Sequence, residues 1–134
     1  MALQYSVTVR NAQLDAVESA IGTAPKLQLR TGAPPANCAT ADSGTLLCEM
    51  TLPSDWMDAA AAGSKPKLGT WSGSGAADGD VGHFRVKDSA GTTTHMQGTV
   101  TATAGGGDAT MDNITVTTSL PVAVNSFTIN VGNA

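Results

Sequence analysis

The stretch from Val81 to Thr103, VGHFRVKDSAGTTTHMQGTVTAT, constrains the fold of this chain more than any other segment. Apolar and polar residues alternate in both of its halves, which is the period of a β-strand. Between the halves, Asp88-Ser89-Ala90-Gly91 supplies a turn acceptor and a glycine that tolerates positive φ. We therefore expect an antiparallel hairpin whose core-facing residues include Phe84 and Met96. The opposite, solvent-facing row begins with His83, Arg85 and Lys87.

The N-terminal segment predicts the chain's clearest helix, over VRNAQLDAVESAI. Ser6 or Thr8 can cap its start, and Gly22 followed by Pro25 ends it. Its apolar stripe consists of Val7, Leu14, Val17 and Ile21. Two roles are open for this helix: a cover over the β-sheet, or an arm that binds a partner.

Short β segments separated by turn-forming residues occupy most of the remaining chain. A second, Ala-rich helical turn is expected after Ser54, with Trp56 as a core anchor. The expected strands are KLQLRT, GTLLCEMTLP, residues 68–71, the two arms of the hairpin, NITVTT, LPVAVN and SFTINV; the expected loops are GAPPANCATADSG, SGSGAADGD and AGGGDATMDN.

This pattern predicts a mainly β protein, an antiparallel β-sandwich or jelly-roll-like fold with an N-terminal α-helix. The 134 residues are enough for one domain with its own core. We expect a single domain over 1–134, divided into a helical segment, 1–25, and a β-rich body, 26–134.

Charge and hydropathy exclude several classes of function. The net charge is −4 and the seven Lys and Arg residues are scattered, which opposes direct binding of nucleic acid. No apolar run approaches the roughly 18 residues of a membrane span, and MALQYSVTVRN lacks the features of a signal peptide. We expect synthesis in a cytosol, with no membrane partner. The charged fraction of only 13% suits either packing among neighbouring proteins or an inert soluble β-domain.

No pattern in the sequence specifies catalysis or a cofactor. A G-x-S-x-G elbow is missing, and the eleven acids offer no defined catalytic pair. His83 and His95 can face each other across the hairpin, but no spacing supplies a third metal ligand. Asp78-Gly79-Asp80 has the composition of a calcium loop without the ligand spacing of one. We expect no enzyme activity, no cofactor and no metal site.

The two cysteines have different surroundings in the sequence. Cys48 shares a strand face with Leu46, Met50 and Leu52, which predicts burial as a small apolar side chain. Cys38 lies in a loop, and we expect both thiols to be free because a cytosol is reducing.

Nearly the whole chain resembles a group of small proteins encoded among the virion genes of tailed bacteriophages and prophages. The resembling segments are MALQYSVTVRNAQLDAVESAIG, RTGAPPANCATADSGTLL, LPSDWM with the alanines after it, GTW, HFRVKDSAGTTTHMQGTVTAT, the late MDN and SFTINVGNA. The resemblance implies a structural part of a phage particle, made in the host bacterial cytoplasm and located in the virion.

Within a virion, a small β domain with a terminal helix suggests a capsid decoration (cement) protein present in many copies. Its partners would be the major capsid protein, other virion proteins or further copies of itself. A tail, collar or fibre component is the alternative, and a small binding module outside the virion is the second alternative. The candidate contact residues are Leu3, Tyr5, Arg10, Pro34 and Pro35.

Overall fold

The computed structural model describes residues 3–132, which form a mainly β fold with a single helix among them. The elements, in chain order, are α1 (Val7–Ile21), β1 (Lys26–Arg30), β2 (Leu46–Thr51), β3 (Ser64–Pro66), β4 (Trp71–Ser74), β5 (Gly79–Asp80), β6 (His83–Lys87), β7 (Thr94–Ala102), β8 (Ala109–Met111), β9 (Thr115–Val116), β10 (Pro121–Val124) and β11 (Ser126–Asn130).

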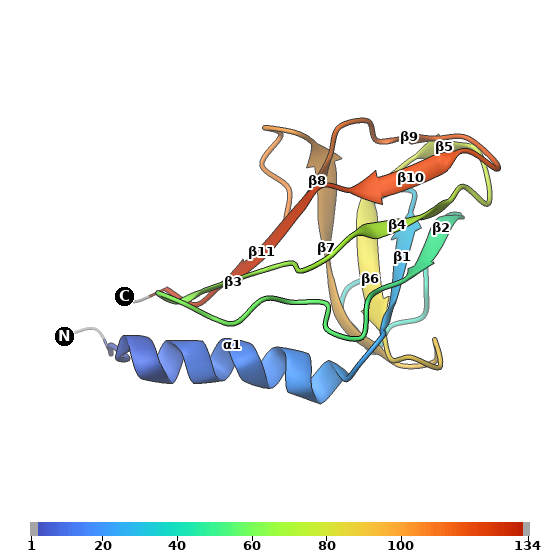
Figure 1. Cartoon of the computed structure of the whole chain (residues 1–134). Coiled ribbons are helices and arrows are strands. Elements are labelled where there is room, and N and C mark those ends of the chain that lie inside the picture. Colours follow the sequence, from blue (N-terminus) through green and yellow to red (C-terminus); the bar gives the residue numbers. More distant parts are fainter. Residues whose placement is uncertain (1–2, 133–134) are drawn as a thin grey trace.

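Seven of these strands form one sheet in the order β2-β1-β6-β7-β8-β11-β3, and β10–β4 and β5–β9 form two small ladders (Figure 1). The expected hairpin is confirmed as β6–β7 and lies at the middle of the large sheet. Val86 pairs with Met96, and Phe84 pairs with Gly98. A Cβ atom at Gly98 would lie 2.8 Å from Phe84 Cε1, so a glycine here lets the ring pass across the neighbouring strand.

The sheet is mixed and not entirely antiparallel, because β8 runs parallel to β7. The expected loop AGGGDATMDN therefore contains a strand. The chain turns back after β7 through Ala104 and Gly106, both at positive φ, and Asp108 accepts hydrogen bonds from the Thr99 amide and hydroxyl. These bonds hold the return segment against β7, which places Ala109 beside Val100.

Helix α1 begins at Val7, two residues before the expected segment, which selects Ser6 over Thr8 as the cap, and it ends at Ile21 as the sequence predicts. Ser6 Oγ accepts a hydrogen bond from the Val9 amide, and Gly22 ends the helix at φ 91°. Leu14 and Ile21 are buried, but Val7 is 46% exposed, so the predicted apolar stripe is buried only from Leu14 onward.

The helix expected after Ser54 is wrong. Residues 56–61 are not helical, and Ala62 and Gly63 form a turn at positive φ. The segment pairs with the chain around β3 through the bridges Met57–Lys67 and Ala61–Ser64. These pairings give the backbone amides and carbonyls of the segment their hydrogen bonds. They outweigh the high helix propensity of its alanines. Trp56 is the core anchor that the sequence predicts: it is fully buried and donates from Nε1 to the Gly22 carbonyl at 3.0 Å.

The strand expected over residues 68–71 is shifted toward the C-terminus. Strand β4 begins at Trp71 and runs into the expected SGSG loop, where it pairs with β10. Trp71 connects two parts of the core, since its ring lies 6.0 Å from Trp56 and 5.4 Å from Phe127 between centroids. Phe127 in turn meets Phe84 edge to face at 5.4 Å.

The molecule has an arm that extends to one side of the remaining strands (Figure 1). We define the arm as helix α1, residues 57–67 with strand β3, and the part of β11 that pairs with β3. The rest of the strands form the body.

Candidate partner-binding surfaces

Hydrogen bonds to the backbone hold the first half of helix α1 in the arm. Arg10 donates from Nη1 to the Val131 carbonyl at 3.2 Å, and the Gly63 amide donates to Asn11 Oδ1 at 3.0 Å. A Cβ atom at Gly63 would lie 2.5 Å from Arg10 Nη1, and Gly63 has a φ of 76°. Arg10, a candidate contact residue, therefore connects helix α1 to the chain directly after β11 with its side chain.

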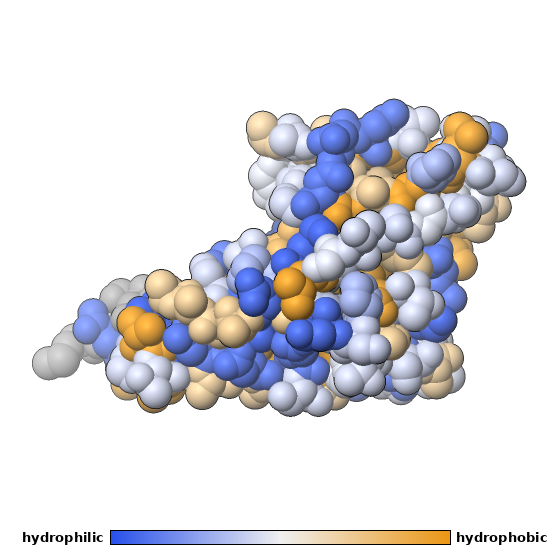
Figure 2. Space-filling model, in the orientation of Figure 1, coloured by the Kyte–Doolittle hydropathy of each residue, from blue (hydrophilic) through white to orange (hydrophobic). Residues whose placement is uncertain are grey.

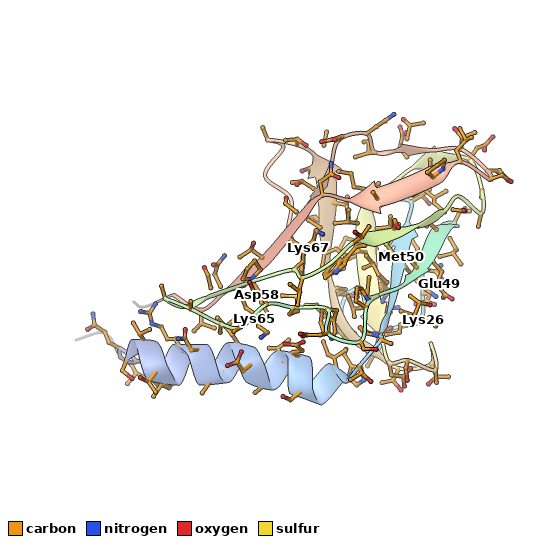
Figure 3. The ribbon with its side chains drawn as sticks, viewed as in Figure 1. Lys26, Glu49, Met50, Asp58, Lys65 and Lys67 are labelled. Carbon is orange, nitrogen blue, oxygen red and sulfur yellow. The ribbon has the colours of Figure 1, made fainter. Side chains whose placement is uncertain are left out.

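Farther along the helix, Lys65 on β3 forms what we call the Lys65 cluster. Its Nζ lies 2.8 Å from Asp15 Oδ1, 2.8 Å from Glu18 Oε2 and 2.8 Å from the Asp58 carbonyl oxygen. These three acceptors match the three N–H donors of an ammonium group. Figure 3 shows Lys65 and Asp58 in the space between β3 and the helix.

The charges in this cluster shift two pKa values. Burial by itself disfavours the charged form of Lys65, but the hydrogen bonds and charges of Asp15 and Glu18 outweigh it and raise the pKa of Lys65. The hydrogen bond from Lys65 and that from the Ala60 amide lower the pKa of Asp15. The cluster therefore favours the ionised form of both partners.

The N-terminal end of the arm exposes apolar side chains. Leu3 is 71% exposed and Tyr5 is 42% exposed. Val7 and Val9, in the first turn of the helix, are 46% and 43% exposed. Figure 2 shows apolar surface at the far end of the arm. Isolated exposed apolar residues are normal on proteins, but four within seven residues form a local cluster. We call these four residues the arm tip.

The second candidate surface is the 31–45 loop, which lies against the polar row of the hairpin. Pro34 and Pro35 are half-buried, and the Pro35 carbonyl accepts a hydrogen bond of 2.7 Å from Gln97 on β7. Asn37 organises the loop internally, because its Oδ1 accepts from the amides of Ala39 and Thr40. The loop is therefore bound to the body and is not a free tether.

Beneath this loop the expectation of a solvent-facing row is wrong. His83 is fully buried, Arg85 is 1% exposed and Lys87 is 7% exposed, so β6 is buried on both faces. The sequence predicts the alternation of the two faces correctly, but a distant loop covers the polar one.

Asp42 connects the loop to three cations in what we call the Asp42 cluster. Its Oδ1 lies 2.6 Å from Arg85 Nη1, and its Oδ2 lies 2.6 Å from Lys87 Nζ and 3.1 Å from Arg30 Nη2. Arg85 also donates from Nη2 to the Cys38 carbonyl at 2.9 Å. Partial burial opposes ionisation of Asp42, but the hydrogen bonds from Lys87 and Arg85 and the charge of Arg30 outweigh it and lower its pKa.

Three of the four residues considered for metal binding have other partners: His83 Nδ1 lies 2.9 Å from the Gly32 carbonyl oxygen, and Asp78 and Asp80 bind threonines. His83 pairs with Thr99 in the β6–β7 ladder, whereas His95 lies at the register shift next to Lys87 and is exposed, so the expected cross-strand pair of histidines is wrong. Asp78 and Asp80 accept hydrogen bonds from Thr118 and Thr115 respectively and fix the chain around the β5–β9 ladder. Across residues 3–132, no group of three His, Cys, Asp or Glu side chains is placed to hold a metal ion.

The two thiols are free, as expected. Cys48 is fully buried, and this burial raises the pKa of its thiol. Cys38 is half-buried in the loop, next to the Asp42 cluster.

No pattern in the sequence predicts the two charged clusters. Asp42 is 43 residues from Arg85 and Lys65 is 50 residues from Asp15. Short-range charge spacing finds ion pairs within one helix but not those formed between distant segments.

No helix in the described part of the chain is long and apolar enough to cross a membrane. Comparison with known proteins gives no match to a family model, a curated protein or a solved structure.

Proposed function

We propose that this protein is a structural component of a tailed-phage particle, in particular a capsid decoration protein that bridges adjacent major capsid subunits. The observation that carries the proposal is the arm, which presents Leu3, Tyr5, Val7 and Val9 at the far end of a braced helix. The resemblance to proteins encoded among virion genes supports the location of this protein in a phage particle.

The construction of the arm supports a role in contact rather than chemistry. The helix is fixed at Arg10, Asn11 and Lys65, so the arm tip is presented in a defined position. Preorganisation lowers the entropy lost on binding, which favours a stable contact with a partner. A protein that binds only the assembled shell stabilises that shell by mass action.

We also propose that the body is a variant of a β-sandwich. The close approach of β4 to β2 supports it: a Cβ atom at Gly73 would lie 3.1 Å from Cys48 Sγ and 3.2 Å from Met50 Cβ. A glycine allows this approach of one ladder to the neighbouring sheet. Jelly-roll connectivity would require antiparallel neighbours where β7 and β8 are parallel.

The test uses purified protein and expanded, undecorated capsids of the phage whose virion genes include this chain. We expect saturable binding at many equivalent sites and a higher disruption temperature of the capsid. Leu3→Asp should weaken binding by placing a charge in the apolar contact, while Leu120→Asp, at a leucine 54% exposed on the body, should not.

Neither substitution touches the core, so both variants should keep the melting temperature of the free protein. Absence of capsid binding, together with antibody labelling of the tail in electron micrographs, would overturn the decoration role in favour of a tail component. Equal binding by Leu3→Asp and wild type would overturn the role of the arm tip.

A further inference from the structure

The Asp42 cluster contains more positive charge than its one carboxylate can balance. Arg30, Arg85 and Lys87 contribute three positive charges around a single negative one. The side chains of Arg85 and Lys87 are only 1% and 9% exposed, so water does little to screen them. This concentration is unusual in a chain with seven Lys and Arg residues and a net charge of −4.

Neighbouring carboxylates reduce this excess only partly. Glu49 reaches the cluster through Gln28, whose Nε2 donates to Glu49 and whose Oε1 accepts from Arg30. Asp88 lies in the hairpin turn, where its carboxylate accepts hydrogen bonds from the amides of Thr92 and Thr93. Neither carboxylate forms a salt bridge with the cluster among the described residues.

The cluster borders an open pocket between the loop and the hairpin turn. Its lining consists of residues 38–42 from the loop, Thr92, Thr93 and Thr94 from the hairpin, and Arg85 and Lys87 from β6. Within the described part of the chain, Lys87 Nζ makes one hydrogen bond, to Asp42, so two N–H donors remain. The buried Nε of Arg85 likewise has no hydrogen-bond partner there.

We propose that this pocket binds a small oxyanion against Lys87, with Arg85 and Arg30 supplying charge from behind. An oxyanion offers several acceptor oxygens for the remaining ammonium donors and for the hydroxyls of Thr93 and Thr94, while the Thr92 hydroxyl donates to Asp88. Its negative charge balances the excess positive charge of the Asp42 cluster. An oxyanion bound there connects residues 38–42 to the hairpin. This site is independent of the arm and of the proposed role in a capsid.

Inorganic phosphate is the first probe, titrated into ¹⁵N-labelled protein at constant ionic strength with chloride as the reference salt. We expect saturable amide shifts in residues 38–42 and 92–94, and a melting temperature that rises and then levels off with phosphate concentration. Acetate in a parallel titration distinguishes two kinds of natural ligand, a free tetrahedral anion and a carboxylate. Tighter binding of phosphate indicates a free tetrahedral anion, and equal binding indicates a carboxylate such as that of a partner side chain.

Lys87→Gln should abolish the saturable shifts, whereas Lys26→Gln should retain them. Lys26 is the matched control because it pairs with Lys87 in the β1–β6 ladder and carries the same charge but does not border the pocket. Shifts that are absent or linear in wild type, or unchanged in Lys87→Gln, would overturn the proposal. The wild-type titration decides the matter even if Lys87→Gln folds poorly.

Discussion

The Asp42 and Lys65 clusters attach two different segments to the sheet with opposite arrangements of charge. In the Lys65 cluster one buried cation meets two carboxylates, and it holds helix α1 against β3. In the Asp42 cluster one carboxylate meets three cations, and it holds the 31–45 loop against β6. Together they use seven of the 18 charged residues of the chain (7 Lys and Arg plus 11 Asp and Glu).

The difference lies in which members are buried. The acids of the Lys65 cluster reach water, with side chains 53% exposed at Asp15 and 23% at Glu18. In the Asp42 cluster, by contrast, the side chains of Arg85 and Lys87 are only 1% and 9% exposed to water. Removing a central residue is costly when it leaves buried charges without a partner, and mild when the remaining charges can be hydrated.

The largest effect should come from Asp42→Asn. The substitution leaves Arg85 and Lys87 buried without their carboxylate, so we expect the free energy of unfolding to fall by about 3 kcal/mol, measured by urea denaturation. Asp55→Asn, which changes an exposed acid outside both clusters, is the control and should stay close to wild type. If Asp42→Asn were as stable as wild type, the loop would not depend on this carboxylate.

Lys65→Met should have a smaller effect. Methionine fills much of the space of the lysine stem, and the two acids left behind can be hydrated, so we expect a loss of about 1–2 kcal/mol. Relative to wild type, amide hydrogen exchange in the variant should become faster in helix α1 but not in β6. Lys67→Met is the matched control, because Lys67 makes no ion pair with Asp15 or Glu18 and its Nζ lies 5.6 Å from the Trp71 ring centroid. A loss larger than that of Asp42→Asn would reverse the comparison.

The smallest effects should be pH-dependent. The pKa of Lys65 is raised on folding, so its stabilisation is complete below the unfolded value of about 10.4 and is lost as pH rises through the folded value. The stability difference between wild type and Lys65→Met should therefore shrink in alkaline solution. The pKa of Asp42 is lowered on folding, so its contribution is complete above about 3.9 and is lost as pH falls through the folded value.

Urea denaturation of the three proteins across pH checks both directions. The difference between wild type and Asp42→Asn should shrink in acid solution. A difference that stays constant between neutral and strongly alkaline pH for Lys65→Met would show that the lysine acts through packing alone.

Local patterns predicted those elements whose contacts are local. The hairpin around Phe84 follows from alternation plus a turn, and helix α1 follows from its Ser6 cap and Gly22 stop. The prediction at Ser54 failed because the amides of the following residues pair across a turn with the chain around β3. The sequence does not predict strand β8, because β8 pairs in parallel with β7 and no tight hairpin turn marks it. The side chain of Asp108, which accepts a hydrogen bond from the Thr99 amide, holds the segment before β8 against β7.

Sequence pattern alone predicts a mainly β chain with Phe84 and Trp56 in its core, and the structure confirms both. The free thiols of Cys38 and Cys48 agree with the expectation but do not follow from the sequence pattern. The burial of the polar row of β6 depends on tertiary packing, because strand periodicity separates two faces without saying what covers them. Likewise, only the tertiary structure brought Asp42 to Arg85 and Asp15 to Lys65. Such pairs depend on how distant segments pack, and that information is absent from any local window of residues.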